Sequence, residues 1–404
     1  MTRPPAVGFD AGSRKKRRRT GPDLAPVAKW RLVLLMAAAA GVSQAFGRFT
    51  YSLLFTDLRD DFAISNTVAG ALGSANLGAY LLGSLVVSMI VGRLGLERTL
   101  RAGIVGSAGS LLVVAWSPSL LVTFGAMMAA GFSGAFVWIT APGLAAAALG
   151  AQRRGLAVGV TGAGIGLGIA SASVLASTLA GAQWRQVYWF EAVVGVVVAV
   201  AVLIELRNPP RLGKSQRVGL ASVKQVPGWF GLLMAYGLFA LALSLVMTFT
   251  VAVLEHDAGW PEAEAALAFT AIGVGTIAGG PVFGPMSDRF GRSTVLVIAF
   301  TVVAATGVLL PLGFRGWSVA VAFAFGMAFT GVPTTIAARV SDVVDAEHFG
   351  AVFGAATLAF GAGLFIGPQL GGYLADLTDS FKPAFAVVVG SAVIGAAVGI
   401  GQPG

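Results

Sequence analysis

The sequence predicts an all-α integral membrane protein in which twelve transmembrane helices form two six-helix pseudo-symmetric bundles. Three observations predict this fold class: the composition, the number of long apolar stretches and an internal repeat. Apolar residues make up 56% of the 404 residues and charged residues only 11%, whereas soluble proteins carry roughly 25% charged residues. The mean hydropathy is +0.83 and the chain holds 56 glycines, a residue that is more frequent in membrane helices than in soluble ones.

The chain divides into twelve apolar stretches, each close to the roughly 20 residues that a helix needs to cross the hydrocarbon core. In the first half the predicted spans are 31–56, 67–91, 99–116, 120–148, 155–180 and 186–206. In the second half they are 229–254, 262–286, 293–312, 316–338, 350–375 and 382–401. Two of these spans begin with helix-start signals: Ser65 is a predicted N-cap, and Pro261 precedes an acidic first turn.

The second half of the chain repeats the first at an offset of about 196 residues. Gly92–Gly95, between the second and third spans, falls on Asp288–Gly291 between the eighth and ninth. This repeat predicts an N-terminal bundle over 30–206 and a C-terminal bundle over 229–404, joined by a cytoplasmic linker over 207–228. Parallel repeats of this kind are related by an axis normal to the membrane.

Most of the net charge of +9 belongs to residues 1–29, which hold eight basic and two acidic side chains. The run Arg14–Arg19 has no apolar period, so this segment is a predicted disordered cytoplasmic tail. A nucleic-acid patch is one alternative, but ahead of an apolar helix we favour an anchor beside anionic lipid. A cleaved signal peptide is another, and it is disfavoured because the apolar stretch continues through Leu54.

The distribution of Lys and Arg predicts the orientation in the membrane. With both termini in the cytoplasm, 22 of the 27 basic residues lie on the cytoplasmic side, in agreement with the positive-inside bias. We therefore expect a multi-pass protein of the cell inner (plasma) membrane.

The composition predicts no cofactor, no metal site and no catalytic residue. The chain has no cysteine and two histidines, which excludes disulfides and thiolate sites and does not favour zinc or haem. Asp342, Asp345 and Glu347 form an acidic cluster without metal-ligand partners. The expected partners are a small-molecule substrate and the lipid bilayer, with no nucleic acid and no obligate protein partner.

Several segments resemble a known family. Gly284–Arg292, with the sequence GPMSDRFGR, resembles the major facilitator superfamily signature G-x-x-x-D-R-x-G-R, and Gly363–Gly372 resembles the Gly–Pro-rich motif of its helix 11. Gly47–Tyr51 and Ala75–Gly78 are similar to the bacterial YbfB/YjiJ-like branch of this superfamily. The first-half copy of the signature departs from the pattern, because Gly92 stands where the acidic residue belongs.

The resemblance implies a secondary transporter that works by alternating access, with its substrate near the bilayer midplane between the halves. Proton coupling is what the superfamily implies by default. The resemblance also implies a gating role for five residues of the second-half signature: Gly284, Asp288, Arg289, Gly291 and Arg292. In this interpretation Asp288 pairs with an arginine or caps a neighbouring helix, which latches the cytoplasmic side closed; a solvated turn is the alternative.

Arg48 is the most informative single residue, because a charge inside a span must face protein or a water-filled cavity. Gln44, Arg48 and Tyr51 follow one another at i, i+4 and i+7, which predicts one polar stripe. We expect a central cavity with a cationic centre, and hence an anionic substrate such as a carboxylate. Snorkelling or a structural ion pair is the alternative. Further predicted lining residues are Asn76, Tyr80, Trp138, for which plain packing is equally expected, and Tyr236.

Glu191 is the second charge inside a predicted span and the candidate for proton coupling. It follows Arg185 by only six residues, so we favour a position near the outer interface, away from the cavity.

Taken together, these patterns predict a proton-coupled secondary active transporter for a small solute, with organic anions as the preferred class. A drug or metabolite efflux antiporter with a hydrophobic substrate is the alternative. A membrane receptor or enzyme would need clustered functional side chains at one membrane face, and a channel would need a charged ring or a filter segment. The sequence is compatible with uptake and with efflux.

Overall fold

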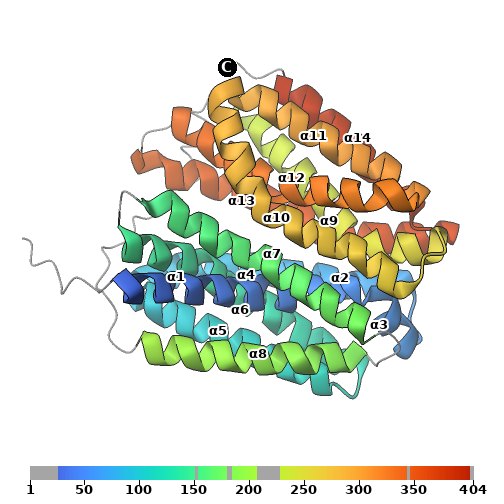
Figure 1. Cartoon of the computed structure of the whole chain (residues 1–404), viewed down its shortest axis with the longest axis horizontal. Helices are drawn as coiled ribbons and strands as arrows, with labels where there is room; N and C mark the ends of the chain where they lie inside the picture. Colours follow the sequence, from blue (N-terminus) through green and yellow to red (C-terminus); the bar gives the residue numbers. More distant parts are fainter. Residues whose placement is uncertain (1–25, 151–152, 180–183, 207–227, 344–345, 401–404) are drawn as a thin grey trace, which may run out of the picture.

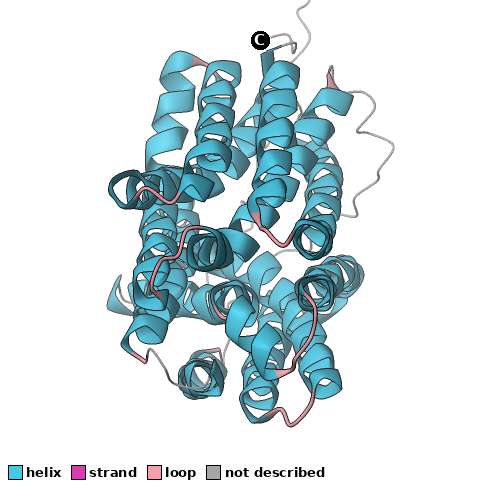
Figure 2. Ribbon diagram, turned by 90° about the vertical axis from the view of Figure 1, so that its right-hand side faces the viewer, coloured by secondary structure: helices cyan, strands magenta, loops and turns pink. Residues whose placement is uncertain are grey.

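The computed structural model describes residues 26–150, 153–179, 184–206, 228–343 and 346–400. These residues are helical apart from short turns and contain no strand (Figure 2). Most of the predicted tail, 1–25, and most of the predicted linker, 207–227, lie outside the described residues.

Two groups of helices lie one above the other (Figure 1). The first group, here called the N-terminal half, consists of α1 (Pro26–Ala40), the π-helix η1 (Gly41–Phe49), α2 (Thr50–Leu53), α3 (Phe55–Asp61), α4 (Asn66–Leu94), α5 (Leu96–Trp116), α6 (Leu120–Leu149), α7 (Arg154–Thr178) and α8 (Trp184–Glu205). The second group, the C-terminal half, consists of α9 (Trp229–Ala252), the π-helix η4 (Val253–Asp257), α10 (Glu262–Phe290), α11 (Arg292–Leu309), the 3₁₀ turn η5 (Leu310–Leu312), α12 (Arg315–Val343), α13 (Ala346–Thr378) and α14 (Lys382–Ile400).

The described helices have the length and the surface of membrane spans. Eleven are long and apolar enough to cross a bilayer, and Lys382–Val398 is a shorter apolar helix. Large apolar side chains such as Met89 and Val197 point outward and are exposed, as lipid-facing residues are. The all-α membrane class is therefore confirmed, and the helix count is consistent with the twelve predicted spans.

The internal repeat extends to the helix bounds. Shifted by 196 residues, α4 falls on α10 from first to last residue. Each of these helices is followed by a glycine with positive φ, +82° at Gly95 and +86° at Gly291, a conformation that other residues rarely adopt. The backbone turn of the signature is thus present in both halves, although Gly92 replaces the carboxylate of Asp288.

Both predicted helix starts are present. The Ser65 hydroxyl accepts a hydrogen bond from the backbone N–H of Val68 at 3.3 Å, which satisfies one of the free donors at the start of α4. Pro261 directly precedes α10, whose first turn carries Glu262 and Glu264.

The first span differs from the predicted continuous helix over 31–56. Its middle is the π-helix η1, and the chain then continues through α2 into the short helix α3. The predicted charged break after residue 56 is therefore helical. π-Helical turns are rare and frequently mark functional sites.

The two halves touch through glycines. The two helix pairs that make the most extensive contacts between the halves are α4 with α13 and α7 with α10. A Cβ atom on Gly70 would lie 2.2 Å from the carbonyl oxygen of Pro368, and one on Gly166 would lie 2.5 Å from that of Gly273. The backbones meet at distances that only glycine permits.

Candidate functional site

A small cavity of about 20 Å³ lies between the two halves, which is room for roughly one water molecule. Side chains of both halves line it: Arg48, Phe49, Tyr51, Ser52 and Leu77 from the N-terminal half, and Ser244, Met247, Thr248, Leu364 and Pro368 from the C-terminal half. Arg48 is the one charged residue among the described lining residues.

The guanidinium of Arg48 is held by neutral groups. Its Nη1 donates to Gln44 Oε1 at 3.1 Å, and its central carbon lies 4.5 Å from the ring centroid of Tyr80. Its Nε has no hydrogen-bond partner, and within the described part of the chain Arg48 forms no ion pair. The site therefore contains a cation that protein groups satisfy only in part.

Gln44 and Asn76 hold the π-helix in place. Gln44 Nε2 donates to the carbonyl of Gly134 on α6 at 3.0 Å. Asn76, on α4, donates from Nδ2 to the carbonyls of Gly47 at 2.9 Å and Met127 at 2.7 Å. These amides bind backbone carbonyls, so they position the helix that presents Arg48.

The four predicted aromatic lining residues separate into two groups. Tyr51 lines the cavity while its hydroxyl donates to the carbonyl of Ala69, and Tyr80 contacts Arg48 as described above. Tyr236, on α9, is buried with its ring centroid 4.5 Å from that of Phe360. Trp138, on α6, packs against the core. Neither Tyr236 nor Trp138 is among the described lining residues of this cavity.

Glu191 is fully buried on α8. Thr50, the first residue of α2, donates its hydroxyl hydrogen to Glu191 Oε1 at 2.5 Å. The side chain therefore faces the first span inside the N-terminal half, in the first two turns of α8. The spacing from Arg185 in the sequence does not show that this face of α8 points at the first span.

The second-half signature forms a network within the C-terminal half. Asp288 pairs with Arg292, whose Nε also binds Asp342 Oδ2 on α12 at 2.9 Å. Arg289 instead lies over the ring of Phe290, at 5.4 Å from its centroid. Gly291 provides the positive-φ turn, and Gly284 packs loosely near Thr334. Among the described residues, this network joins α10, α11 and α12 and does not bridge the two halves.

The family described as "Uncharacterised MFS-type transporter YbfB" matches the chain over residues 36–400. The chain belongs to this family. This family is part of the major facilitator superfamily of membrane transporters, which is not an enzyme class.

Curated relatives and a solved structure agree with this assignment. The transporter YgaY of Escherichia coli O157:H7 is 29% identical over 46% of this chain and 48% of its own length. The 3-(3-hydroxy-phenyl)propionate transporter of E. coli K12 is 26% identical over 84% of this chain and 82% of its own. The chain spans about half the length or less of the first relatives that it matches. A structure of the nucleoside transporter NupG has the same fold, with a TM-score of 0.76 at 14% identity over 92% of this chain and 99% of that one.

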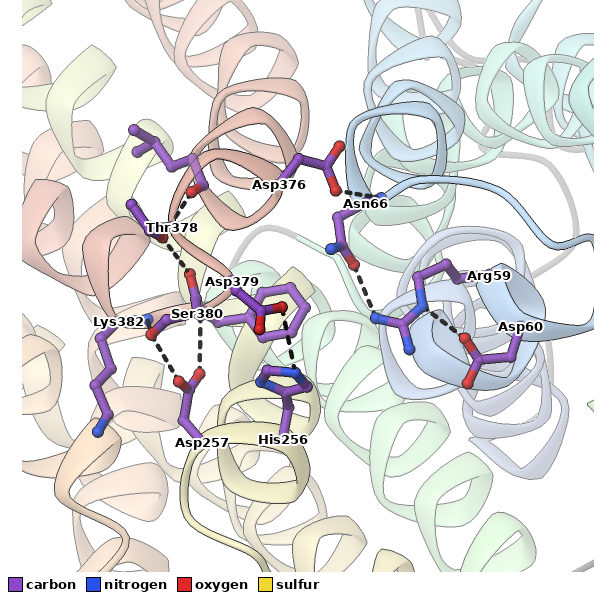
Figure 3. Close-up of polar contacts among 12 residues, drawn as sticks. Arg59, Asp60, Asn66, His256, Asp257, Asp376, Thr378, Asp379, Ser380 and Lys382 are labelled. Carbon is purple, nitrogen blue, oxygen red and sulfur yellow. Dashed lines mark hydrogen bonds and ion pairs between the residues drawn. The ribbon is translucent and has the colours of Figure 1, made fainter.

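The two halves are joined at the end that carries α3, here called the α3 end, which the sequence predicts to be external. Asp376, on α13, accepts hydrogen bonds from the backbone N–H groups of Asn66 at 2.9 Å and Thr67 at 2.7 Å, and from the Thr67 hydroxyl (Figure 3). A carboxylate of one half thus caps the start of α4 in the other, where free N–H groups and the helix dipole favour negative charge. No sequence motif marks Asp376.

Acidic residues of the two halves also lie near each other at the α3 end. Thr56 donates to Glu255 Oε2, on η4, at 2.9 Å. Burial, together with the nearby carboxylates of Glu262 and Asp60, raises the pKa of Asp57 from 3.8 to about 6. Asp57 belongs to the N-terminal half and Glu262 to the C-terminal half, so the charge on Asp57 opposes closure of this end.

Proposed function

We propose that this protein is a proton-coupled secondary transporter for small organic anions, which binds the substrate carboxylate at Arg48 and works by alternating access. We place it in the inner membrane with both termini in the cytoplasm, on the strength of the basic-residue distribution. The observation that carries the proposal is the partly buried Arg48 guanidinium, which lines the cavity between the halves with an unpartnered Nε and no described carboxylate.

A cation of this kind is costly inside a membrane protein unless acceptors surround it. A substrate carboxylate would supply two acceptor oxygens in the fork geometry that a guanidinium binds best. The rings of Tyr80 and Phe49 lie 4.5 and 5.5 Å from the guanidinium carbon and orient it by cation–π contact. They also favour a substrate with an aromatic ring. The relative named for 3-(3-hydroxy-phenyl)propionate, an aryl carboxylate, supports the same class.

The size of the cavity supports the proposal of alternating access. At about 20 Å³ it does not hold an organic anion, so the halves must separate before substrate reaches Arg48. Asp376 ties the halves together at the α3 end. We therefore expect substrate to enter this conformation from the opposite, predicted cytoplasmic, end.

The test is the binding of 3-(3-hydroxyphenyl)propionate to the purified protein, measured by calorimetry beside its uncharged amide. We expect the acid to bind and the amide to bind at least tenfold more weakly. Arg48→Lys should weaken binding of the acid about tenfold or more, because a charge-assisted bidentate contact contributes roughly 1.5–3 kcal/mol. Arg185→Lys is the matched control, since Arg185 pairs with Asp61 at 2.8 Å outside the cavity. Equal affinity of the wild type and Arg48→Lys for the acid would refute the proposed role of Arg48.

One observation supports the alternative, export of a hydrophobic compound: Leu77, Met247 and Leu364 give the cavity an apolar wall. The same measurement separates the two functions. A neutral hydrophobic compound that binds equally to the wild type and to Arg48→Lys, with no preference for the acid, would establish the alternative.

A further inference from the structure

Glu191 is a buried acid whose surroundings satisfy only one of its oxygens. Oε1 accepts the hydrogen bond from Thr50, whereas Oε2 has no partner among the residues that the structure describes. The side chain is 0% exposed. One turn earlier on α8, the buried hydroxyl of Tyr188 also lacks a partner. Two unsatisfied polar groups therefore lie together in the interior of the N-terminal half.

No described cation compensates a negative charge on Glu191 from its own helix. Arg185, six residues earlier, points to Asp61 and to the carbonyl of Ser117. At the far end of α8, Glu205 pairs with Arg31; this pair is fourteen residues, or about 21 Å of helix, beyond Glu191.

The helices packed against α8 are α1, η1, α5 and α7, and their charges lie elsewhere. Arg185 contacts Ser117, so the end of α5 adjoins the start of α8, and the charged residues of α5 are at its other end. Arg48, on η1, faces the cavity. The titratable group close to Glu191 is Tyr188, which in turn lies near Tyr51. The charged residues of these packed helices are Lys29, Arg31, Arg48, Glu97, Arg98, Arg101 and Arg154.

An isolated carboxylate in such a place is far more costly than the neutral acid. Resting on the proposed proton-coupled transport, we infer that Glu191 is the proton-binding group of the cycle. Thr50 links Glu191 to the end of the π-helix that carries Arg48. The link is short along the chain: Thr50 directly follows the π-helix that ends at Phe49, and Arg48 lies two residues before it.

The proton exchange involves two oxygens and one neighbour. The proton binds to Oε2, which takes the side-chain charge from −1 to 0 while Thr50 still donates to Oε1. When the proton leaves, both oxygens require donors, and the unpartnered hydroxyl of Tyr188 is the nearest group of that kind on α8. Ionisation therefore favours a rearrangement of Glu191 that pulls on Thr50. Because the π-helix directly precedes Thr50, such a shift changes the placement of Arg48 on the opposite face of the first span.

The first experiment needs no substrate. Infrared difference spectra of the purified protein over a pH titration report the C=O stretch of a protonated carboxyl group. We expect such a band at neutral pH, and we expect Glu191→Gln to remove it. Glu205→Gln on the same helix, and Asp57→Asn at the α3 end, are the matched controls and should keep it. A spectrum unchanged by Glu191→Gln at every pH overturns the inference.

The second experiment tests the coupling in proteoliposomes with 3-(3-hydroxyphenyl)propionate. A proton gradient should drive accumulation in the wild type and in Glu205→Gln. In Glu191→Gln accumulation should fall to the level without a gradient, while exchange of labelled for unlabelled substrate continues. Accumulation by Glu191→Gln at the wild-type level overturns the inference and leaves the organic-anion function intact. If the wild type does not transport the acid, the proposed substrate class fails, and the infrared titration still decides whether Glu191 binds the proton.

Thr50 is a positioning residue in this scheme, and its variants separate positioning from folding. Thr50→Ser keeps the hydroxyl and should accumulate substrate like the wild type. Thr50→Val keeps the shape and loses the donor, so the infrared midpoint should move to higher pH because the ionised carboxylate loses its only hydrogen bond. An unchanged midpoint in Thr50→Val refutes the link between Thr50 and the proton.

Discussion

At the scale of single residues, Asp57 makes closure of the α3 end depend on pH. Its pKa is raised from 3.8 to about 6 in the closed arrangement by burial and by Glu262 and Asp60. The closed form therefore binds this proton more tightly than a form in which Asp57 is exposed to water. The contribution to closure is fully present below about pH 4, declines as the pH rises toward 6 and is absent above that value.

This dependence is measurable as a distance between the halves. The chain has no cysteine, so spin labels can be attached at Leu121→Cys on α6 and Trp317→Cys on α12, both exposed at the α3 end. We expect the longer, open distance to gain population between about pH 4 and 6 in the wild type, and Asp57→Asn to reduce this change. Asp379→Asn, in the exposed turn after α13, is the control and should respond like the wild type. A response that Asp57→Asn leaves intact would assign the titration to another group.

The sequence predicted polar residues in the first span better than it predicted their roles. Arg48 stood out because a charge within an apolar stretch must face the interior. Gln44 and Asn76 were expected to line the cavity, yet they bind backbone carbonyls of α6 and of the π-helix. Asp376 could not be singled out, because its role depends on the start of α4, roughly 310 residues away along the chain.

At the scale of helices, the contact of α4 with α13 depends on glycine. A Cβ atom on Gly70 or on Gly372 would lie 2.2 Å from a backbone oxygen of the other half. We therefore expect Gly70→Ala to shift the same label pair toward the open distance by about tenfold in population, because backbone atoms cannot yield to the methyl group. Gly92→Ala, on the same helix with nothing within 4 Å, is the matched control. An unchanged distance in Gly70→Ala would mean that the two helices separate at little cost.

Helix lengths followed from hydropathy alone, because each span must match the same apolar thickness. The π-helix could not be predicted from hydropathy, because its backbone pattern is accompanied by a hydrogen bond from Asn76, on another helix, to the carbonyl of Gly47. The spacing of apolar residues in the first span does not indicate that hydrogen bond.

At the scale of the whole molecule, the two halves share a backbone repeat but not its charges. Asp288 and Arg292 form a network inside the C-terminal half, and Gly92 leaves the N-terminal copy without a carboxylate. Two described carboxylates bridge the halves at the opposite end, Asp376 and Glu255. The backbone turn that both halves share has no described partner across the interface, and closure of the α3 end rests on the helix cap of Asp376 and on the Thr56–Glu255 hydrogen bond.

Removing this cap should change the balance between the two access states. In Asp376→Asn the charge that complements the start of α4 is lost, at a cost of about 1 kcal/mol for an exposed cap, so the open distance between labels at positions 121 and 317 should gain roughly fivefold in population. Asp288→Asn removes a carboxylate at the other end and should leave this distance unchanged. If both variants shift it equally, the halves respond to net charge rather than to the cap. If neither does, the Thr56–Glu255 hydrogen bond and the glycine contacts hold the α3 end closed, and Gly70→Ala tests the glycine contacts separately.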